Sequence, residues 1–254
     1  MKPTLGRRGF VVGLASLPLA GCDRITQSDW GKRILGSVDG LNRRLQRMLA
    51  GPDRLAREYS EAEISPIFRP NGNTDPGTDS YHALAQGGFA DYRLEIAGLV
   101  ERPASFSLAE LKALPSRTQI TRHDCVEGWS VIGKWTGARL GPLLDRVGVK
   151  PDANYVLFRC ADSFAGVFGS AEPYYESIDL DDAYHAQTLL AYDLNGQSLP
   201  IENGAPLRLR VERQLGYKMA KYVMRIELVA DLSGAGSGKG GYWEDHGYAW
   251  YAGI

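Results

Sequence analysis

The chain has 254 residues, a length at which one globular domain with an appended segment is expected. With 44% hydrophobic and 23% charged residues, its composition excludes collagen-like, coiled-coil and largely disordered proteins. A formal net charge of -1 argues against nucleic acid as a partner, and three cysteines are too few for a disulfide-stapled scaffold.

The small net charge hides an uneven distribution along the chain. Residues 1–60 hold 11 of the 29 Lys and Arg residues but only 5 of the 30 Asp and Glu residues. This part therefore carries about +6, and residues 61–254 carry about -7. We expect the N-terminal part to be a different kind of segment from the rest.

Residues 1–22 have the pattern of an export signal. Lys2, Arg7 and Arg8 precede an apolar run, Phe10–Ala20, that is shorter than the ~20 residues needed to span a bilayer. The arginine pair resembles a twin-arginine (Tat) signal, and the Leu-Ala-Gly-Cys sequence ending at Cys22 resembles a bacterial lipobox, whose cysteine is lipidated after cleavage. We expect Tat export to the periplasm and membrane attachment through Cys22. The alternative is an ordinary Sec signal in which Cys22 is a coincidence.

Residues 23–60 form a basic segment for which we expect an amphipathic tether. Apolar residues recur at spacings of three and four, and the basic residues lie mostly off that stripe. A helix of this kind either rests on an anionic membrane surface or packs on the following domain. Gly36 and Gly40 weaken both alternatives, and Gly51 and Pro52 end the segment. The stripe consists of Trp30, Ile34, Val38, Leu41, Leu45 and Met48.

Residues 61–254 are expected to form one folded domain. Residues 61–88 are rich in Pro, Gly, Asn and Asp and predict a long ordered loop or the lining of a site. Residues 92–96 alternate as a half-buried strand does, and Ser107 and Glu110 have the spacing of a capping box. Since helices are few and short, we predict an α+β fold, a β-rich mixed single domain. The further predicted strands are Thr118–His123, Tyr155–Cys160, Thr188–Asp193, Leu207–Val211 and Tyr222–Val229, with a hairpin turn at Asn195 and Gly196 and helices at Arg139–Val147 and Asp179–His185.

Three common catalytic motifs are incomplete or missing from the sequence. Gly234–Gly240 superficially resembles a phosphate-binding loop, but it has Ser233 where the motif needs glycine and Gly240 where the motif needs the hydroxyl that binds magnesium. We interpret it as a flexible or ligand-approaching glycine loop. The four histidines lack the spacing of a zinc-binding helix, and there is no Gly-x-Ser-x-Gly elbow.

The most informative stretch is Arg122–Ser130, with a Trp-Thr-Gly sequence beginning at Trp135. Cys125 leaves a predicted strand into a loop, in a protein expected to be exported to an oxidising compartment. A thiolate is a soft ligand suited to a redox metal. Taken alone, the stretch leaves three alternatives open: a metal ligand, a buried cysteine, and a disulfide between Cys125 and Cys160.

Taken together, four segments resemble the sulfite-oxidase superfamily of molybdenum enzymes. Asp124–Ser130 resembles its cysteine loop, and Asn203–Arg208 with Gly216–Val223 resembles its cofactor-phosphate segment. The ending Gly241–Tyr248 also resembles the family. The resemblance runs from about residue 66 to the end in one order, and it identifies residues 61–254 as a molybdopterin-binding oxidoreductase domain.

The resemblance implies a mononuclear molybdenum-molybdopterin cofactor with Cys125 as the ligand of the metal. It places Asn203 and Arg208 on the pterin, and Asn71 or Asn73 in the loop beside the cofactor. Cys160 lies near a position where relatives carry a cofactor-contacting threonine, which puts this one contact in doubt. A pterin phosphate needs positive charge and N–H donors, which Arg208, Lys218 and Lys221 supply. The residues implied at the phosphate are Met219, Ala220 and Lys221.

The branch of the family bears on the reaction. Sulfite oxidases carry Cys-Ala-Gly-Asn-Arg-Arg, whose arginines help to bind an oxyanion, whereas this chain has Cys-Val-Glu-Gly-Trp-Ser from Cys125 onward. That sequence resembles the catalytic subunit of the periplasmic methionine-sulfoxide reductase system. It implies oxygen-atom transfer that reduces a sulfoxide or an N-oxide. Because no haem-attachment motif is present, the electrons are expected to come from a membrane b-type cytochrome or another quinol-linked donor.

Several side chains near Cys125 are candidates for the catalytic pocket. Arg122 and His123 are candidate polar groups near the metal, and Trp129, Tyr242 and Trp243 are candidate pocket walls. Core packing is the alternative for each. We expect a monomer that acts on a small molecule or on methionine sulfoxide. The alternatives to a reductase are a sulfite dehydrogenase with the same cofactor and a binding lipoprotein that lost the cofactor.

Overall fold

The computed structural model describes residues 28, 30, 40–48, 51, 53–165 and 171–254. The chain divides into two compact units, Met1–Leu49 and Ala50–Ile254, which are considered separately. In the first unit residues 40–48 are helical. The predicted export signal and part of the predicted tether lie outside the described residues. No helix in the described ranges is both long and apolar enough to cross a bilayer.

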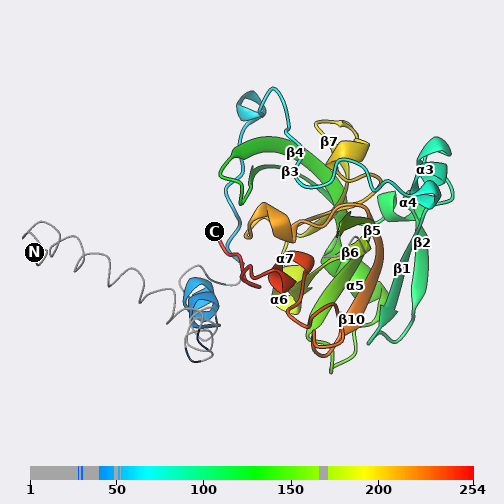
Figure 1. Ribbon diagram of the computed structural model, residues 1–254. Helices are drawn as coiled ribbons and strands as arrows, with labels where there is room; N and C mark the ends of the chain where they lie inside the picture. The colour runs from blue at the N-terminus through cyan, green and yellow to red at the C-terminus, as the bar shows by residue number, and fades with distance from the viewer. Residues whose placement is uncertain (1–27, 29, 31–39, 49–50, 52, 166–170) are drawn as a thin grey trace, which may run out of the picture. The chain divides into compact units, whose positions relative to one another are not determined.

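The first sheet of the second unit is mixed, with strand order β2-β1-β10-β5-β6 (Figure 1). Strand β1 pairs with β10 in parallel, and the other neighbours are antiparallel. Leu94 and Ile96 of β1 point into the core while Arg93 and Glu95 face solvent, which is the predicted alternation. The strands are β1 (Arg93–Gly98), β2 (Ala104–Ser107), β5 (Tyr155–Ala165), β6 (Ala171–Asp179) and β10 (Val223–Val229).

The second sheet is antiparallel, with strand order β3-β4-β7-β8 and with β9 also paired to β7. The β7–β8 hairpin turns at Asn195 and Gly196, as predicted. The outer edge of β3 is covered by residues just before the domain, because the Tyr59 N–H donates to the Ile120 carbonyl at 2.9 Å. The strands are β3 (Ser116–Asp124), β4 (Ser130–Arg139), β7 (Leu189–Leu194), β8 (Gln197–Ser198) and β9 (Arg208–Arg210).

Short helices connect the strands. Ser107 and Glu110 form the predicted capping box at the start of α4. The prediction of a loop throughout residues 61–88 is wrong at α3, which Thr78 caps and which is held by a hydrogen bond from buried Tyr81 Oη to the Ala205 carbonyl at 2.7 Å. The helices are α3 (Asp79–Gln86), α4 (Leu108–Lys112), α5 (Leu140–Val147), α6 (Leu180–Ala183) and α7 (Tyr242–Asp245), with single 3₁₀ turns η1 (Glu61–Glu63), η3 (Ile201–Asn203) and η4 (Gly216–Lys218).

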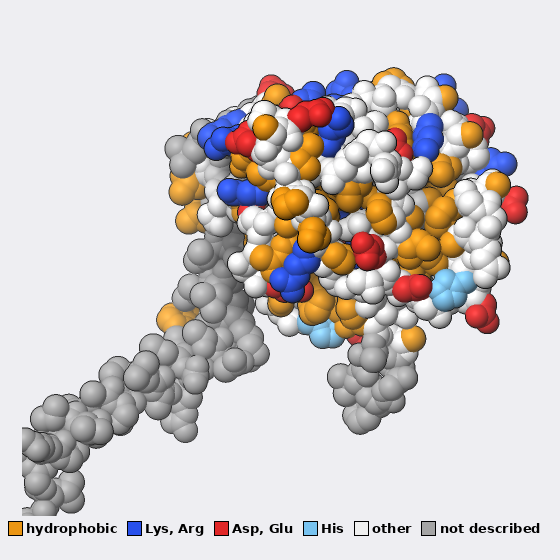
Figure 2. All heavy atoms as spheres, turned by 90° about the horizontal axis from the view of Figure 1, so that it is seen from above, with side chains coloured by type: hydrophobic (Ala, Val, Ile, Leu, Met, Phe, Trp, Pro, Cys, Tyr) orange, Lys and Arg blue, Asp and Glu red, His pale blue; other side chains and the backbone are white. Residues whose placement is uncertain are grey.

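The predicted α+β class is confirmed, but four strands were not among the predicted ones: β2, β4, β6 and the two-residue β8. Strand β4 contains two glycines, and at Gly137 a Cβ would lie 2.5 Å from the Leu190 carbonyl oxygen of β7. Such a close approach of backbones suits glycine yet weakens the strand signal in the sequence. Side chains of both charges are distributed over the face shown in Figure 2, with hydrophobic patches between them.

Candidate active site

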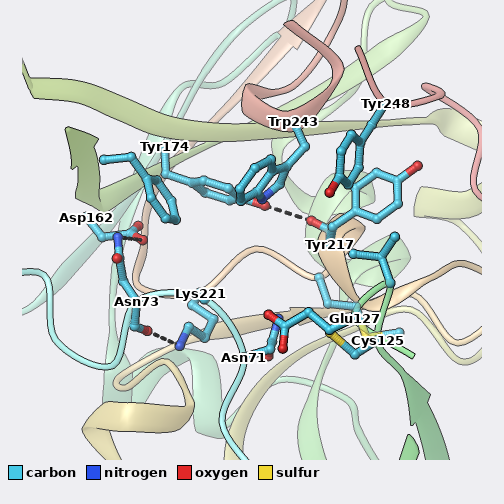
Figure 3. A pocket seen from close by; sticks show the side chains of 14 residues that line it. Asn71, Asn73, Cys125, Glu127, Asp162, Tyr174, Tyr217, Lys221, Trp243 and Tyr248 are labelled. Carbon is cyan, nitrogen blue, oxygen red and sulfur yellow. Dashed lines mark hydrogen bonds between the residues drawn. The ribbon is translucent and has the colours of Figure 1, made fainter. Parts of the chain in front are cut away.

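A cavity of about 100 Å³ lies where residues from both sheets and from the segments around them meet (Figure 3). In this view Cys125 and Glu127 lie on one side, Asp162 and Asn73 lie on the other, and Lys221 lies between them. The lining consists of Asn71, Gly72, Asn73, Cys125, Val126, Glu127, Asp162, Phe164, Tyr174, Tyr217, Met219, Lys221, Trp243 and Tyr248.

Cys125 is positioned by the tight turn of the β3–β4 hairpin. The Cys125 N–H donates to the Trp129 carbonyl at 2.9 Å, and the Gly128 N–H donates to the Cys125 carbonyl at 3.0 Å. Gly128 has φ +87°, a backbone conformation that favours glycine. The turn thereby holds the Cys125 thiol at the cavity, where burial raises its pKa. Burial therefore favours the protonated thiol, whereas a bound metal would favour the thiolate.

Lys221 lines the cavity and Arg208 lies next to it, behind Asn71, and neither cation has a carboxylate partner among the described residues. Arg208 is fully buried and donates to the Asn203 carbonyl at 3.0 Å and to Asn71 Oδ1 at 2.8 Å. Lys221 donates to the carbonyls of Asn73 and Glu202. Burial, together with the charge of Arg210, lowers the pKa of Arg208 to about 9. Burial, together with the charge of Arg208, lowers the pKa of Lys221 to about 7.

This arrangement fits an anionic, hydrogen-bonding ligand. Buried cations that bond only to neutral acceptors are costly unless an anion compensates them. Three further buried polar atoms around the cavity lack a partner: Arg208 Nε, Asn203 Nδ2 and Asp162 Oδ1. Arg208 and Lys221 supply the positive charge and, with Asn203 Nδ2, the donors that a pterin phosphate needs, whereas Asp162 Oδ1 can only accept a hydrogen bond while it is ionised. Cys125 supplies a soft ligand for molybdenum. The residues present therefore fit the implied cofactor.

His123 is buried beneath the cavity and does not line it. Arg210 Nη1 donates to His123 Nδ1 at 3.1 Å, so the neutral ring carries its proton on Nε2, which has no partner in the described structure. Burial and the charges of Arg208 and Arg210 lower the pKa of His123 well below its usual value. His123 is therefore a neutral donor at neutral pH and cannot act there as a cation.

Gly216 provides the space that His123 occupies. A Cβ at Gly216 would lie 2.3 Å from His123 Cε1, which is too close for any side chain. We expect Gly216→Ala to lower the free energy of unfolding by ~1–3 kcal/mol, because the buried ring must shift. Urea denaturation measures this loss. The control is Gly234→Ala, where a Cβ would meet nothing within 4 Å; an equal loss in both variants would contradict the prediction.

Arg122 and Trp129, predicted as catalytic, do not line the cavity. Alternation along β3 turns Arg122 away from His123, and its Nε lies 2.8 Å from Asp124 Oδ1. Trp129 lies at the rim, where its Nε1 donates to Glu127 Oε2 at 2.9 Å and the Arg69 guanidinium stacks over its ring at 5.0 Å. Direct contact of either side chain with a metal on Cys125 has no support in this geometry.

Lys218, which was predicted to bind the cofactor phosphate, does not line the cavity. Lys218 is fully buried and donates to the carboxylates of Glu176 and Glu244, which are also buried. Although burial opposes the charged form, the two carboxylates raise the pKa of Lys218. Its charge is therefore already balanced within the protein. Lys218 joins η4, β6 and α7, each of which carries a residue of the cavity wall.

Two other predicted contacts lie off the cavity. Cys160 pairs with Val223 in the first sheet and does not line the cavity. Cys125 and Cys160 are both free, so the alternative of a disulfide between them is wrong. Ala220 is buried with its carbonyl accepting from the Leu209 N–H at 2.8 Å, so only its neighbours Met219 and Lys221 reach the cavity.

Aromatic side chains form a wall that the sequence predicted only at Trp243. Trp243 stacks on Tyr248 at 5.3 Å, and Tyr248 meets Tyr217 edge to face at 5.2 Å. Tyr242, the other predicted wall residue of α7, packs on Phe164 behind the cavity. Sequence alone gave no signal for these rings, since tyrosines on strands and turns more often pack in a core.

Asp162 is a further residue that sequence analysis missed. It is 4% exposed, lines the cavity and accepts a hydrogen bond from Asn73 Nδ2 at 3.1 Å. Burial raises its pKa to about 6. A carboxyl group of this kind exchanges a proton near neutral pH, which is common in functional sites. No group of three or more His, Cys, Asp or Glu side chains suited to a metal occurs in the described part of the chain.

Comparison with known proteins gives the family. The family described as oxidoreductase molybdopterin-binding domain matches residues 82–235. A candidate protein-methionine-sulfoxide reductase subunit, YedZ1, of Azospira oryzae is 39% identical over 97% of this chain and 86% of that protein. The protein-methionine-sulfoxide reductase catalytic subunit MsrP of Xanthomonas axonopodis pv. citri is 40% identical over 61% of this chain and 50% of that protein. The chain thus spans about half the length of the MsrP relative.

The sulfane dehydrogenase SoxCD from Paracoccus pantotrophus is a solved structure similar to this chain. Identity is 27% and the TM-score is 0.49, over 56% of this chain and 39% of that chain. The family match and the relative that covers nearly the whole chain confirm the predicted resemblance. The chain therefore belongs to the molybdopterin-binding oxidoreductase family and is an enzyme whose cofactor is molybdenum bound to molybdopterin.

Proposed function

We propose that this enzyme reduces sulfoxides, methionine sulfoxide among them, at a molybdenum ligated by Cys125. The proposal is supported by the names of the YedZ1 and MsrP relatives, which are described as parts of a protein-methionine-sulfoxide reductase. We further propose that a membrane b-type cytochrome linked to quinol supplies the electrons. When bound, the cofactor supplies the two-electron transfer of an oxygen atom.

The observation that carries the proposal is that the cavity has a thiol at one side and positive charge away from that side. A single thiol lies on one side of the cavity, Lys221 lines the cavity without a carboxylate partner, and Arg208 lies behind the lining residue Asn71, to which it donates a hydrogen bond. In the proposed complex Cys125 ligates the metal, Lys221 and the backbone around Met219 hold the phosphate, and Arg208 with Asn203 holds the pterin. Asn71 and Asn73 fix the orientation of Arg208 and Asp162, respectively.

The side chains near Cys125 favour a neutral substrate. Glu127 lies beside Cys125, and the wall beyond it is formed by Tyr217, Trp243 and Tyr248. A carboxylate repels the sulfite dianion, whereas aromatic rings make favourable contacts with a thioether or a sulfoxide. Lys221 is the one cation in the described lining, and we assign it to the phosphate. This arrangement favours a sulfoxide over sulfite.

A paired assay tests the proposal. Full-length protein matured in a host that makes molybdopterin is assayed with reduced viologen and methionine sulfoxide, and separately with sulfite and ferricyanide. We expect turnover with the sulfoxide, little with sulfite, and roughly stoichiometric molybdenum. Faster turnover of sulfite would favour the dehydrogenase alternative and contradict the proposal.

We also propose the cellular arrangement of the chain. Residues 1–22 form a Tat and lipoprotein signal, 23–60 form a basic tether, and 61–254 form a monomeric catalytic domain in the periplasm. The support is the arginine pair followed by the lipobox-like sequence that ends at Cys22.

Loss of the proposed lipid attachment has a measurable result. We expect Cys22→Ser to move the protein from the membrane fraction to the soluble periplasmic fraction. Without an acyl anchor, the basic tether of residues 23–60 is the one remaining proposed membrane contact, and stable anchoring requires two. Fractionation and immunoblotting measure the distribution. Retention of the variant on membranes at the wild-type level would contradict lipidation of Cys22.

A further inference from the structure

The glycine loop Gly234–Gly240, whose sequence superficially resembles a phosphate-binding loop, surrounds a carboxylate of the protein itself. The Ser237 N–H donates to Asp245 Oδ2 at 2.8 Å, and the Lys239 N–H donates to Asp245 Oδ1 at 3.2 Å. Tyr175 Oη of β6 also donates to Asp245 Oδ2, at 2.6 Å. Backbone N–H groups of such a loop can bind an anion, and here the anion is the side chain of Asp245.

The close fit between the loop and this carboxylate explains why position 236 is glycine. Gly236 has φ +53°, and a Cβ there would be too close to Asp245 Oδ2 and Tyr175 Oη for any side chain. The part of the loop that resembled a nucleotide motif is therefore accounted for by its contact with Asp245.

Asp245 is the last residue of α7, and the same short helix carries Trp243 of the cavity wall. The Trp243 carbonyl accepts from the Tyr248 N–H at 3.0 Å, and the two rings stack at 5.3 Å (Figure 3). Asp245 itself does not line the cavity that contains Cys125. Its effect on that cavity must therefore pass through the position of α7 and the rings that α7 places.

Two carboxylates fix the orientation of α7. A helix of four residues has little stability of its own, so contacts with other segments decide how it lies. Glu244 is bonded to buried Lys218, and Asp245 is bonded to the glycine loop. Because successive residues of a helix point about 100° apart, Trp243, Glu244 and Asp245 lie on three different sides of α7. Loss of the Asp245 bonds releases one of these sides and allows the Trp243 ring to shift.

We propose that Asp245, bound by the glycine loop, is a positioning residue that keeps Trp243 in the wall of the substrate cavity. This role rests on the proposed function, in which the aromatic wall contacts the sulfoxide. The wall contacts the substrate in the ground state and the transition state alike, and it does not contact the reacting bond. Displacement of Trp243 should therefore raise KM and leave kcat nearly unchanged.

The first test is Asp245→Ala in the full-length, molybdenum-loaded enzyme, because alanine removes the acceptor of all three hydrogen bonds. We expect KM for methionine sulfoxide to rise about fivefold while kcat changes by less than about twofold. Asp245→Asn keeps one oxygen for the Ser237 and Tyr175 donors, so its KM should lie between those of the wild type and the alanine variant. Molybdenum content at the wild-type level shows that both variants fold and bind the cofactor.

The matched control is Asp231→Ala. Asp231 also accepts a backbone hydrogen bond, from the Ser233 N–H at 2.9 Å, but it lies just before the glycine loop and not on α7. We expect its KM to equal that of the wild type. An unchanged KM in Asp245→Ala, a loss confined to kcat or to molybdenum content, or an equal rise of KM in Asp231→Ala would overturn the proposal.

Acrylamide quenching of Trp243 fluorescence gives a second measurement that does not depend on turnover. The Trp243 contribution is the difference between each protein and its counterpart with Trp243→Phe. Trp243 is half-buried, so a shift of its ring should strengthen quenching in Asp245→Ala and not in Asp231→Ala. Absence of sulfoxide reduction by the wild type would contradict the proposed function, whereas unchanged quenching in Asp245→Ala would overturn the role of Asp245. The two failures are therefore distinguishable.

Discussion

Replacing Cys125 with serine is expected to reduce sulfoxide reduction by more than about 100-fold, since losing even an outer partner of a metal ligand costs 10–100-fold. Serine has nearly the same size, so the β3–β4 turn and its backbone hydrogen bonds should remain. Its hydroxyl, however, is a hard ligand that stays protonated where a thiol ionises. Steady-state rates with reduced viologen, normalised to protein, measure the effect.

The matched control is Cys160→Ser, because Cys160 is the other free cysteine of the second unit and does not line the cavity. We expect this variant to keep most of the activity. Equal activity of wild-type protein and Cys125→Ser would contradict the assignment of the metal ligand. Equal loss in both variants would show that the effect is not specific to the cavity.

Replacing Lys218 with methionine is expected to destabilise the protein by ~3–5 kcal/mol, because it leaves two buried carboxylates without their cation. For a domain of this size, the melting temperature should fall by roughly 6–20 °C. Glu244→Gln is the control: it keeps the bond between Lys218 and Glu176 and removes the second negative charge. Thermal unfolding should show a much smaller loss for Glu244→Gln, and similar losses would contradict this account of Lys218.

The same cluster predicts how stability changes with pH. Burial, together with the charge of Glu244, raises the pKa of Glu176 well above its usual value of 4.5. The folded protein then holds this proton more tightly than the unfolded chain. The contribution of Glu176 to stability therefore declines as pH rises from about 4.5 towards the raised folded value. Glu176→Gln should flatten the pH dependence of urea unfolding in this range; an unchanged profile would contradict the prediction.

Local signals in the sequence were sufficient for much of the fold. The capping box at Ser107 and the alternation in β1 depend on neighbouring residues only, and the structure has both. Strands β4 and β6 escaped prediction for tertiary reasons. Gly137 is required by the close approach of β7, and β6 carries consecutive buried residues from Tyr174 to Ile178 that do not alternate. Such patterns become interpretable only when the neighbouring strands are known.

The candidate site divides in a similar way. Cys125, Asn71, Asn73, Met219 and Lys221 were all named from sequence motifs, and the structure brings them to one cavity. The position of a lysine in the motif could not distinguish Lys218 from Lys221. In the structure Lys218 is paired with two buried carboxylates, whereas Lys221 donates only to carbonyls.

Partners from distant segments determine that difference. The carboxylates that neutralise Lys218 come from β6 and α7, each more than 20 residues away in the chain. Asp162 escaped prediction for the same reason, because its partner Asn73 lies 89 residues away.

A crystal structure of the molybdenum-loaded enzyme tests the central claim most directly. We expect the metal to lie in the cavity with Cys125 Sγ at bonding distance and the cofactor phosphate to lie beside Lys221. A metal coordinated without Cys125, or a cofactor bound outside this cavity, would contradict this claim.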